Sequence, residues 1–165
     1  MDDHSPSPAI GDLFCTFWLA GHWFGIDARL VKEVSTHTNY APVPHAPPAV
    51  CGYVNLRGHL YLMVDARRLL GMRPLGEDQP SHLIVFKPHV GEAFGILVDR
   101  VGDIVLVAAN QIDVPRSDNE EPAHAPPAGP AAHDMMAGVA KLDQRLLTIL
   151  DPFRILPAIE AEFSR

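Results

Sequence analysis

Short apolar stretches, some of them alternating with polar residues, run along most of the chain, and each one predicts a β-strand. The stretch "LFCTFWLAGHWFGI", residues 13–26, has two apolar runs joined by a Gly-His turn, which is typical of a β-hairpin. The stretch "HLYLMVD", residues 59–65, predicts a strand, and the "ARRLLG" after it predicts a short helical turn. Further short strands are predicted by "LVKEV", "HLIVFKP", "EAFGILVDRVGDIVLV" and "RLLTILD". The pattern therefore predicts a mainly β protein with short helical turns.

The chain repeats itself at two different offsets. Phe24-Gly25-Ile26 recurs 70 residues later as Phe94-Gly95-Ile96, whereas Gly52 recurs 86 residues later as Gly138. The difference of 16 residues predicts an insertion in the second unit, at 114–136, where Pro, Ala and acidic residues prevent core packing. The other matched pairs are Val31 with Val101, Val34 with Ile104, Leu56 with Leu142, Asp65 with Asp151 and Arg68 with Arg154.

The repeat divides one domain, residues 1–165, at the Gly/Pro/acid connector 71–81. The first unit covers about 12–72 and the second about 82–157. Open sheets of short strands leave edges exposed, and closure of a sheet into a barrel removes these edges. We therefore expect two small five-stranded barrels, packed face to face and related by approximate two-fold pseudo-symmetry.

Composition excludes several classes of partner. The formal net charge is −7 and the longest basic run is Arg67-Arg68. This excludes sequence-independent binding of nucleic acid, which needs clustered lysines and arginines to displace counterions from the phosphates. The first residues, "MDDHSPSPAIGD", are polar and acidic, unlike a secretory signal, and no apolar run approaches the ~18 residues of a membrane span. We expect a cytoplasmic protein with no membrane insertion.

No residue set for catalysis, metal binding or cofactor binding is found. Cys15 and Cys51 are far apart and are expected to be buried structural residues. The sequence contains no GxGxxG, GxxxxGK[ST] or GxSxG motif. Asp65 and Asp151 are equivalent under the repeat, which favours helix caps or ion pairs over a catalytic carboxylate pair. No HxH, HxxxH or HExxH spacing occurs among His4, His22, His37, His45, His59, His82, His89, His124 and His133.

Arg57 stands in "NLRGHL", where two predicted strands should turn. Gly58 beside it allows a backbone with positive φ that projects the arginine outward. One interpretation is a solvated turn residue, and the other is a binding residue with five donors for carboxylates or carbonyls. The second unit has Asp143 at this place, so the fold does not require arginine there. In "LVKEV", Val31 and Glu33 share one face of the predicted strand, although an ordinary half-exposed strand has the same pattern.

Five segments together resemble the CheW family of chemotaxis coupling proteins, from about Leu13 to Leu156. The segments are "FGIDARLVKEV", "APPAVCGYVNLRG", "VDARRLLG", "FGILVDRVGDI" and "GVAKLDQRLLTILD". This resemblance implies a non-enzymatic adaptor, with two small barrels, in chemotaxis signal transduction. Its implied partners are the cytoplasmic tips of chemoreceptors and the regulatory domain of a CheA-like histidine kinase. Its implied place is the cytoplasm, with recruitment to membrane receptor arrays through these partners.

The resemblance also implies two binding surfaces. The implied receptor-binding residues are Val31, Glu33, Gly52, Asn55 and Arg57, and the implied kinase-binding residues are Gly95, Asp99 and Val101.

Departures from the family pattern, such as the large Trp18 and Trp23 in the first hairpin, suggest a divergent branch, for example in pilus motility. The alternative function is a small-molecule-sensing barrel with Trp18, Trp23 or His59 at its mouth, although small barrels are normally filled by their own side chains.

Overall fold

The computed structural model describes residues 11–76, 78–114 and 130–163. Most of the insertion predicted at 114–136 lies outside these residues. Its end is described, however, and it differs from the prediction: 130–135 form the 3-10 helix η3 and Met136 begins a strand. Met135 and Met136 are both buried, so the chain returns to the core before the predicted end of the insertion.

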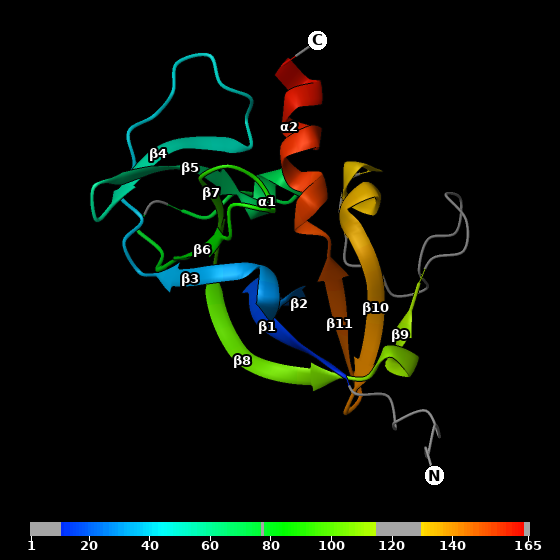
Figure 1. Ribbon diagram of the computed structural model, residues 1–165. Coiled ribbons are helices and arrows are strands. Elements are labelled where there is room, and N and C mark those ends of the chain that lie inside the picture. The colour runs from blue at the N-terminus through cyan, green and yellow to red at the C-terminus, as the bar shows by residue number, and fades with distance from the viewer. Residues whose placement is uncertain (1–10, 77, 115–129, 164–165) are drawn as a thin grey trace.

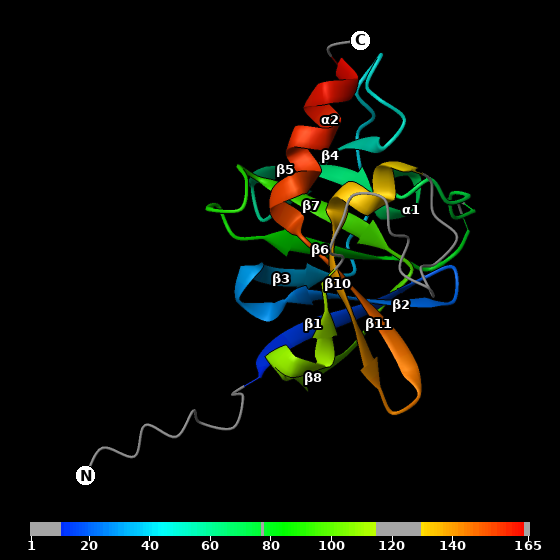
Figure 2. The same ribbon diagram turned by 90° about the vertical axis from the view of Figure 1, so that its right-hand side faces the viewer.

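The fold is mainly β with short helices, as predicted, and it is built of two sheets. In Figure 2 the five-stranded sheet lies above the six-stranded one. The helices are short, with α1 at Ala66–Leu69 and α2 at Ile155–Phe163 (Figure 1). The five-stranded sheet has the order β3(Val31–Ser35), β6(His82–Phe86), β7(Phe94–Val98), β5(His59–Asp65), β4(Val50–Leu56). The other has the order β8(Arg100–Val107), β1(Asp12–Leu19), β2(His22–Asp27), β11(Arg145–Leu150), β10(Met136–Leu142), β9(Ile112–Asp113).

The second sheet differs from the five strands expected for each unit, because β9 adds a sixth strand of two residues beside β10. The sheets also differ from the expected division at 12–72 and 82–157. Each sheet combines the first two strands of one repeat unit with the last strands of the other. The repeat shows which strands are equivalent, but equivalent strands present similar faces, so it does not show from which unit each partner comes.

The strand registers agree with the repeat. In one sheet Phe24 of β2 lies beside Thr148 of β11, in a parallel pair. In the other, Phe94 of β7 lies beside Leu62 of β5, also in a parallel pair. These positions are related by the same offsets, 70 and 86, that the sequence shows. The two sheets are therefore equivalent in strand pairing as well as in sequence.

A central core separates the sheets and a smaller cluster lies on the other face of each one. Side chains of β6 alternate between these cores: Ile84 and Phe86 enter the central one, and Leu83 and Val85 the smaller one. In the central core the rings of Phe86 and Phe94 have centroids 4.9 Å apart. From α2, Ile155 and Ile159 join it, four residues apart on one helix face.

Candidate functional site

The hairpin of β4 and β5 turns at Arg57 and Gly58, as the sequence predicted. Both residues have positive φ, +54° and +87°, which is typical of a two-residue type I′ turn. The Asn55 side chain accepts a hydrogen bond from the Gly58 N–H at 2.9 Å and holds the turn. Positive φ costs an arginine about 1 kcal/mol relative to glycine. Turn geometry therefore does not explain the choice of arginine.

Arg57 contacts a strand from the opposite edge of its sheet. Its Nη2 lies 3.2 Å from Oε2 of Glu33 on β3, and its side chain is 81% exposed. On the same strand, Lys32 Nζ lies 2.9 Å from the Tyr61 hydroxyl of β5. Since β3 and β4 are the two edges of the sheet, these contacts show that the sheet curls. We call the resulting groove, of about 330 Å³, the first seam; its residues are Glu33, Ser35, His37, Asn55, Leu56 and Arg57.

Three of the five predicted receptor-binding residues, Glu33, Asn55 and Arg57, meet in the first seam. Val31 is half-buried and packs against the central core. Gly52 is buried, and a Cβ there would lie 2.1 Å from the Ala41 carbonyl oxygen, so Gly52 is needed for packing. Ser35 and His37 were not predicted, although their spacing of two and four residues from Glu33 was a usable signal.

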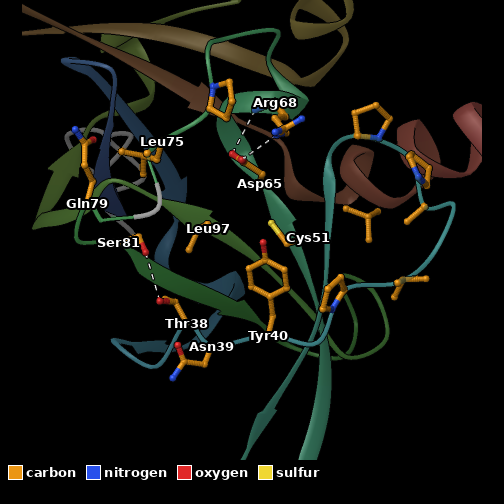
Figure 3. Close-up of a pocket in the computed structure, with 18 of the residues that line it drawn as sticks. Thr38, Asn39, Tyr40, Cys51, Asp65, Arg68, Leu75, Gln79, Ser81 and Leu97 are labelled. Atoms are coloured by element: carbon orange, nitrogen blue, oxygen red, sulfur yellow. Dashed lines mark hydrogen bonds and ion pairs between the residues drawn. The ribbon is translucent and has the colours of Figure 1, made fainter.

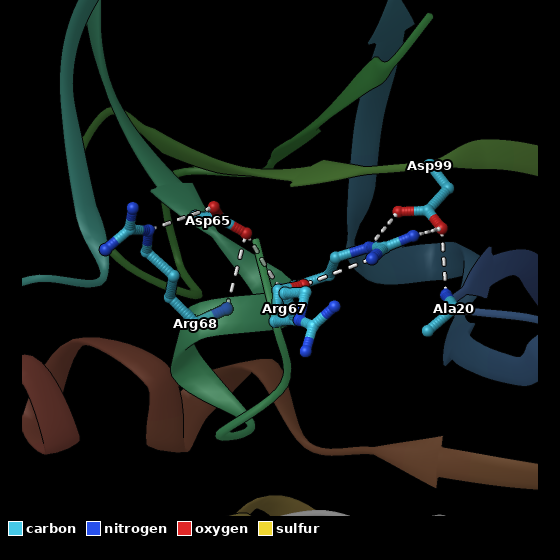
Figure 4. Close-up of polar contacts among 6 residues, drawn as sticks. Ala20, Asp65, Arg67, Arg68 and Asp99 are labelled. Atoms are coloured by element: carbon cyan, nitrogen blue, oxygen red, sulfur yellow. Dashed lines mark hydrogen bonds and ion pairs between the residues drawn. The ribbon is translucent and has the colours of Figure 1, made fainter. Parts of the chain in front are cut away.

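The predicted kinase-binding residues do not form an exposed group. Gly95 is buried, and a Cβ there would lie 2.5 Å from the Ile84 carbonyl oxygen. Asp99 accepts hydrogen bonds from Arg67 Nε at 2.7 Å and from the Ala20 N–H at 2.8 Å (Figure 4). This carboxylate raises the pKa of the Arg67 guanidinium and ties α1 to the β1–β2 turn. Val101 is half-buried, and the kinase-binding role of all three residues stays a prediction.

The two aspartates that close the repeat units are helix caps, as expected. The Asp65 side chain accepts hydrogen bonds from the N–H groups of Arg67 and Arg68, and Asp151 accepts one from Phe153. Each aspartate also forms an ion pair with the arginine three residues later in the chain: Asp65 with Arg68 and Asp151 with Arg154. Burial raises the pKa of Asp65. The interpretation as caps and ion pairs is therefore confirmed.

A hollow of about 690 Å³ lies between the proline-rich stretch 38–48 and the connector before β6. Figure 3 shows Tyr40 beside Cys51, with Ser81 and Asp65 among the other residues that line it. In the part of the chain that the structure describes, no three His, Cys, Asp or Glu side chains are grouped to hold a metal ion. No described helix has the length and apolar character to cross a membrane.

Cys51 is expected to react slowly with thiol reagents in the folded protein. Burial, followed by the charge of Asp65, raises its pKa to about 12, and burial also raises the pKa of Cys15. Only the thiolate is nucleophilic, so labelling by Ellman's reagent at pH 8 should be at least about tenfold slower than in denaturant. Because the unfolded thiol ionises near pH 8.5, Cys51 should also lower the free energy of unfolding as pH rises above about 9. Labelling of the native protein at the denatured rate would contradict this.

Comparisons with known proteins agree with the fold. The CheW-like domain family model matches residues 13–160. Chemotaxis protein CheW of Rhizobium meliloti is 30% identical over 139 residues, 84% of this chain and 83% of that protein. Chemotaxis protein CheW of Klebsiella aerogenes is 27% identical over 152 residues, 92% of this chain and 85% of that protein.

A solved structure has the same fold. The scaffolding protein TtCheW from Thermoanaerobacter tengcongensis superposes with a TM-score of 0.72 at 23% identity, over 86% of this chain and 89% of that one. The strand pairings, the family match and the 30% identical relative all agree with the resemblance found in the sequence. The chain therefore belongs to the family of CheW-like domains.

Proposed function

We propose that this protein is a non-enzymatic adaptor that couples chemoreceptors to a CheA-type histidine kinase. Family membership supports this, as do relatives named chemotaxis protein CheW and a structural neighbour named a scaffolding protein. The protein acts in the cytoplasm and reaches membrane receptor arrays through its partners. Kinase binding is proposed around β7 and β8, where Gly95 and Asp99 shape the backbone and Val101 lies beside them.

The observation that favours the first seam as the receptor-binding site is that Arg57 contacts Glu33 and yet keeps an exposed side chain. Glu33 contacts Nη2 of the guanidinium and orients it, while the side chain stays 81% exposed. An arginine has five N–H donors, so most of them face outward toward a carboxylate or carbonyl of a receptor helix. Leu60, paired with Asn55 on the neighbouring strand and 60% exposed, adds an apolar contact. Charge and apolar surface together fit a helix tip.

Replacement of Arg57 by alanine is expected to abolish receptor coupling and leave the fold intact. The substitution removes the outward donors, and alanine tolerates the turn about as well as arginine does. The measurement is a pulldown from the source organism's lysate, with bound proteins identified by mass spectrometry. The wild type should retain a chemoreceptor and a CheA-like kinase, and the variant should lose the receptor.

Asp143→Ala is the matched control, because Asp143 has the same turn position in the other sheet, with φ of +46°. It should retain the receptor. Circular dichroism should show both variants folded. An Arg57→Ala protein that is folded and still retains the receptor would contradict the proposed site, and an unfolded one would make Arg57 structural. Absence of both partners with the wild type would contradict the adaptor function itself.

A further inference from the structure

The six-stranded sheet has a groove equivalent to the first seam. It lies between β8 and the β10–β11 turn and has a volume of about 530 Å³. We call it the second seam; the residues used below are Trp18, Trp23, Arg100, Asp103, Asp143 and Arg145.

The repeat relates the two seams position by position. Asp103 corresponds to Glu33 at an offset of 70, and Asp143 corresponds to Arg57 at an offset of 86. The second turn, at Asp143 and Gln144, has positive φ at both residues, as the first turn has. The pairing of β3 with β6 and that of β8 with β1 each contain an irregularity, between Val31 and Glu33 and opposite 101–104. The backbones of the seams are therefore alike.

The side chains that bridge the first seam are absent from the second. Lys32 and Tyr61 are replaced by Gly102 and Leu147 at the equivalent positions, so their contact has no counterpart. Where the first seam pairs an acid with an arginine, the second has an acid in both places, Asp103 and Asp143. Within the described residues, neither carboxylate forms an ion pair or a side-chain hydrogen bond. The second seam thus lacks the cation that completes the first.

Two arginines are nearby, but they stack on tryptophans instead of bridging the acids. Trp18 and Trp23 are cross-strand partners whose rings stack with centroids 6.1 Å apart. The guanidinium of Arg100 lies 5.1 Å from the ring centroid of Trp18, and that of Arg145 lies 5.1 Å from the ring centroid of Trp23. Both arginines therefore engage the tryptophans and, among the described residues, form no ion pair with Asp103 or Asp143.

We propose that the second seam binds a basic segment of a partner protein. An arginine or lysine of that segment lies between Asp103 and Asp143, in the place that Arg57 takes in the first seam. The net charge of −7 favours the approach of a basic partner. The proposal rests on the internal repeat and on the charges of the seam, and it does not depend on receptor binding at the first seam.

Tryptophan fluorescence offers a direct test, because the chain has only two tryptophans and both line this seam. The probe is the acetylated and amidated pentapeptide GRGRG, titrated at low ionic strength. We expect a saturable change in emission that weakens as salt is added. Asp103→Asn and Asp143→Asn should each weaken binding about two- to fivefold, since each removes one exposed charge partner. Asp143→Arg should abolish it, because that side chain reproduces the cation of the first seam.

Glu33→Gln is the matched control: it removes the equivalent acid from the first seam and should leave the fluorescence titration unchanged. Circular dichroism checks that Asp143→Arg is folded, and Asp143→Asn, which suits positive φ, supplies a second variant. Absence of a saturable change would overturn the proposal. So would unchanged binding in folded Asp143→Arg, or tighter binding of the matched acidic pentapeptide GEGEG, which would point to Arg100 and Arg145 as the binding groups.

Discussion

Replacing Gly52 by alanine is expected to lower the free energy of unfolding by about 3 kcal/mol, through backbone strain and overpacking together. Gly52 has φ of +153°, which other residues rarely adopt. A Cβ there would lie 2.1 Å from the carbonyl oxygen of Ala41, a backbone atom. That carbonyl also accepts a hydrogen bond from the Tyr53 N–H at 2.9 Å, so the chain at Ala41 cannot move away without breaking the bridge. Urea denaturation measures the loss.

Gly58→Ala is the matched control for Gly52→Ala. Gly58 also has a positive φ, +87°, but nothing lies within 4 Å of a Cβ placed there. We expect a loss of only about 1 kcal/mol, from backbone conformation alone. Equal losses at the two positions would show that the close approach to Ala41 is unimportant. If Gly52→Ala disturbs receptor coupling, the cause is expected to be this loss of structure, which Arg57→Ala avoids.

Replacing Asp99 by alanine should lower the free energy of unfolding by about 2–3 kcal/mol. The side chains of Asp99 and Arg67 are only 19% and 15% exposed, so water replaces the lost ion pair poorly. The substitution also leaves the Ala20 N–H without its acceptor. Because these contacts tie α1 to the β1–β2 turn, the loss should appear in global unfolding, measured by urea denaturation. Asp99→Asn keeps one acceptor oxygen, which can serve either Arg67 Nε or the Ala20 N–H but not both, so it should lose somewhat less than Asp99→Ala.

Asp12→Ala provides the comparison for Asp99→Ala, since the side chains of the ion pair between Asp12 and Arg29 are 55% and 71% exposed. Exposed ion pairs stabilise proteins little, so a much smaller loss is expected. If both substitutions lowered stability equally, the half-buried position of Asp99 would have no special importance. Loss of kinase binding in an Asp99 variant is informative only when the variant is shown to be folded.

Strand positions and turns were predictable from the sequence because they depend on neighbouring residues. The apolar runs of β5 and β6 and the "NLRG" turn gave correct elements. The repeat by itself also identifies Asp143 as the counterpart of Arg57. Strand exchange between the repeat units was not predictable, because β2 presents the same residues whether its neighbour is β5 or β11.

The residues of the candidate site were predictable from the sequence, but the contact between them was not. Residue type and turn position marked Arg57, and alternation marked Glu33, but 24 residues separate them in the chain. Their contact at 3.2 Å exists because the sheet curls and brings its two edges together. A glycine that binds a partner and a glycine that makes room for a neighbouring backbone have the same sequence signal, so the packing of Gly52 and Gly95 emerged only with the fold.

Local information was thus enough for the mainly β character, the two equivalent units, the absence of catalytic motifs and the family. Those properties depend on periodicity, composition and the order of similar segments along the chain, none of which requires knowledge of a tertiary contact. The exchange of strands, the inward engagement of Asp99 and the two seams depend on contacts between distant segments. Which of many compatible pairings forms is a property of the whole packed chain, because burial of both sheets against one core selects it.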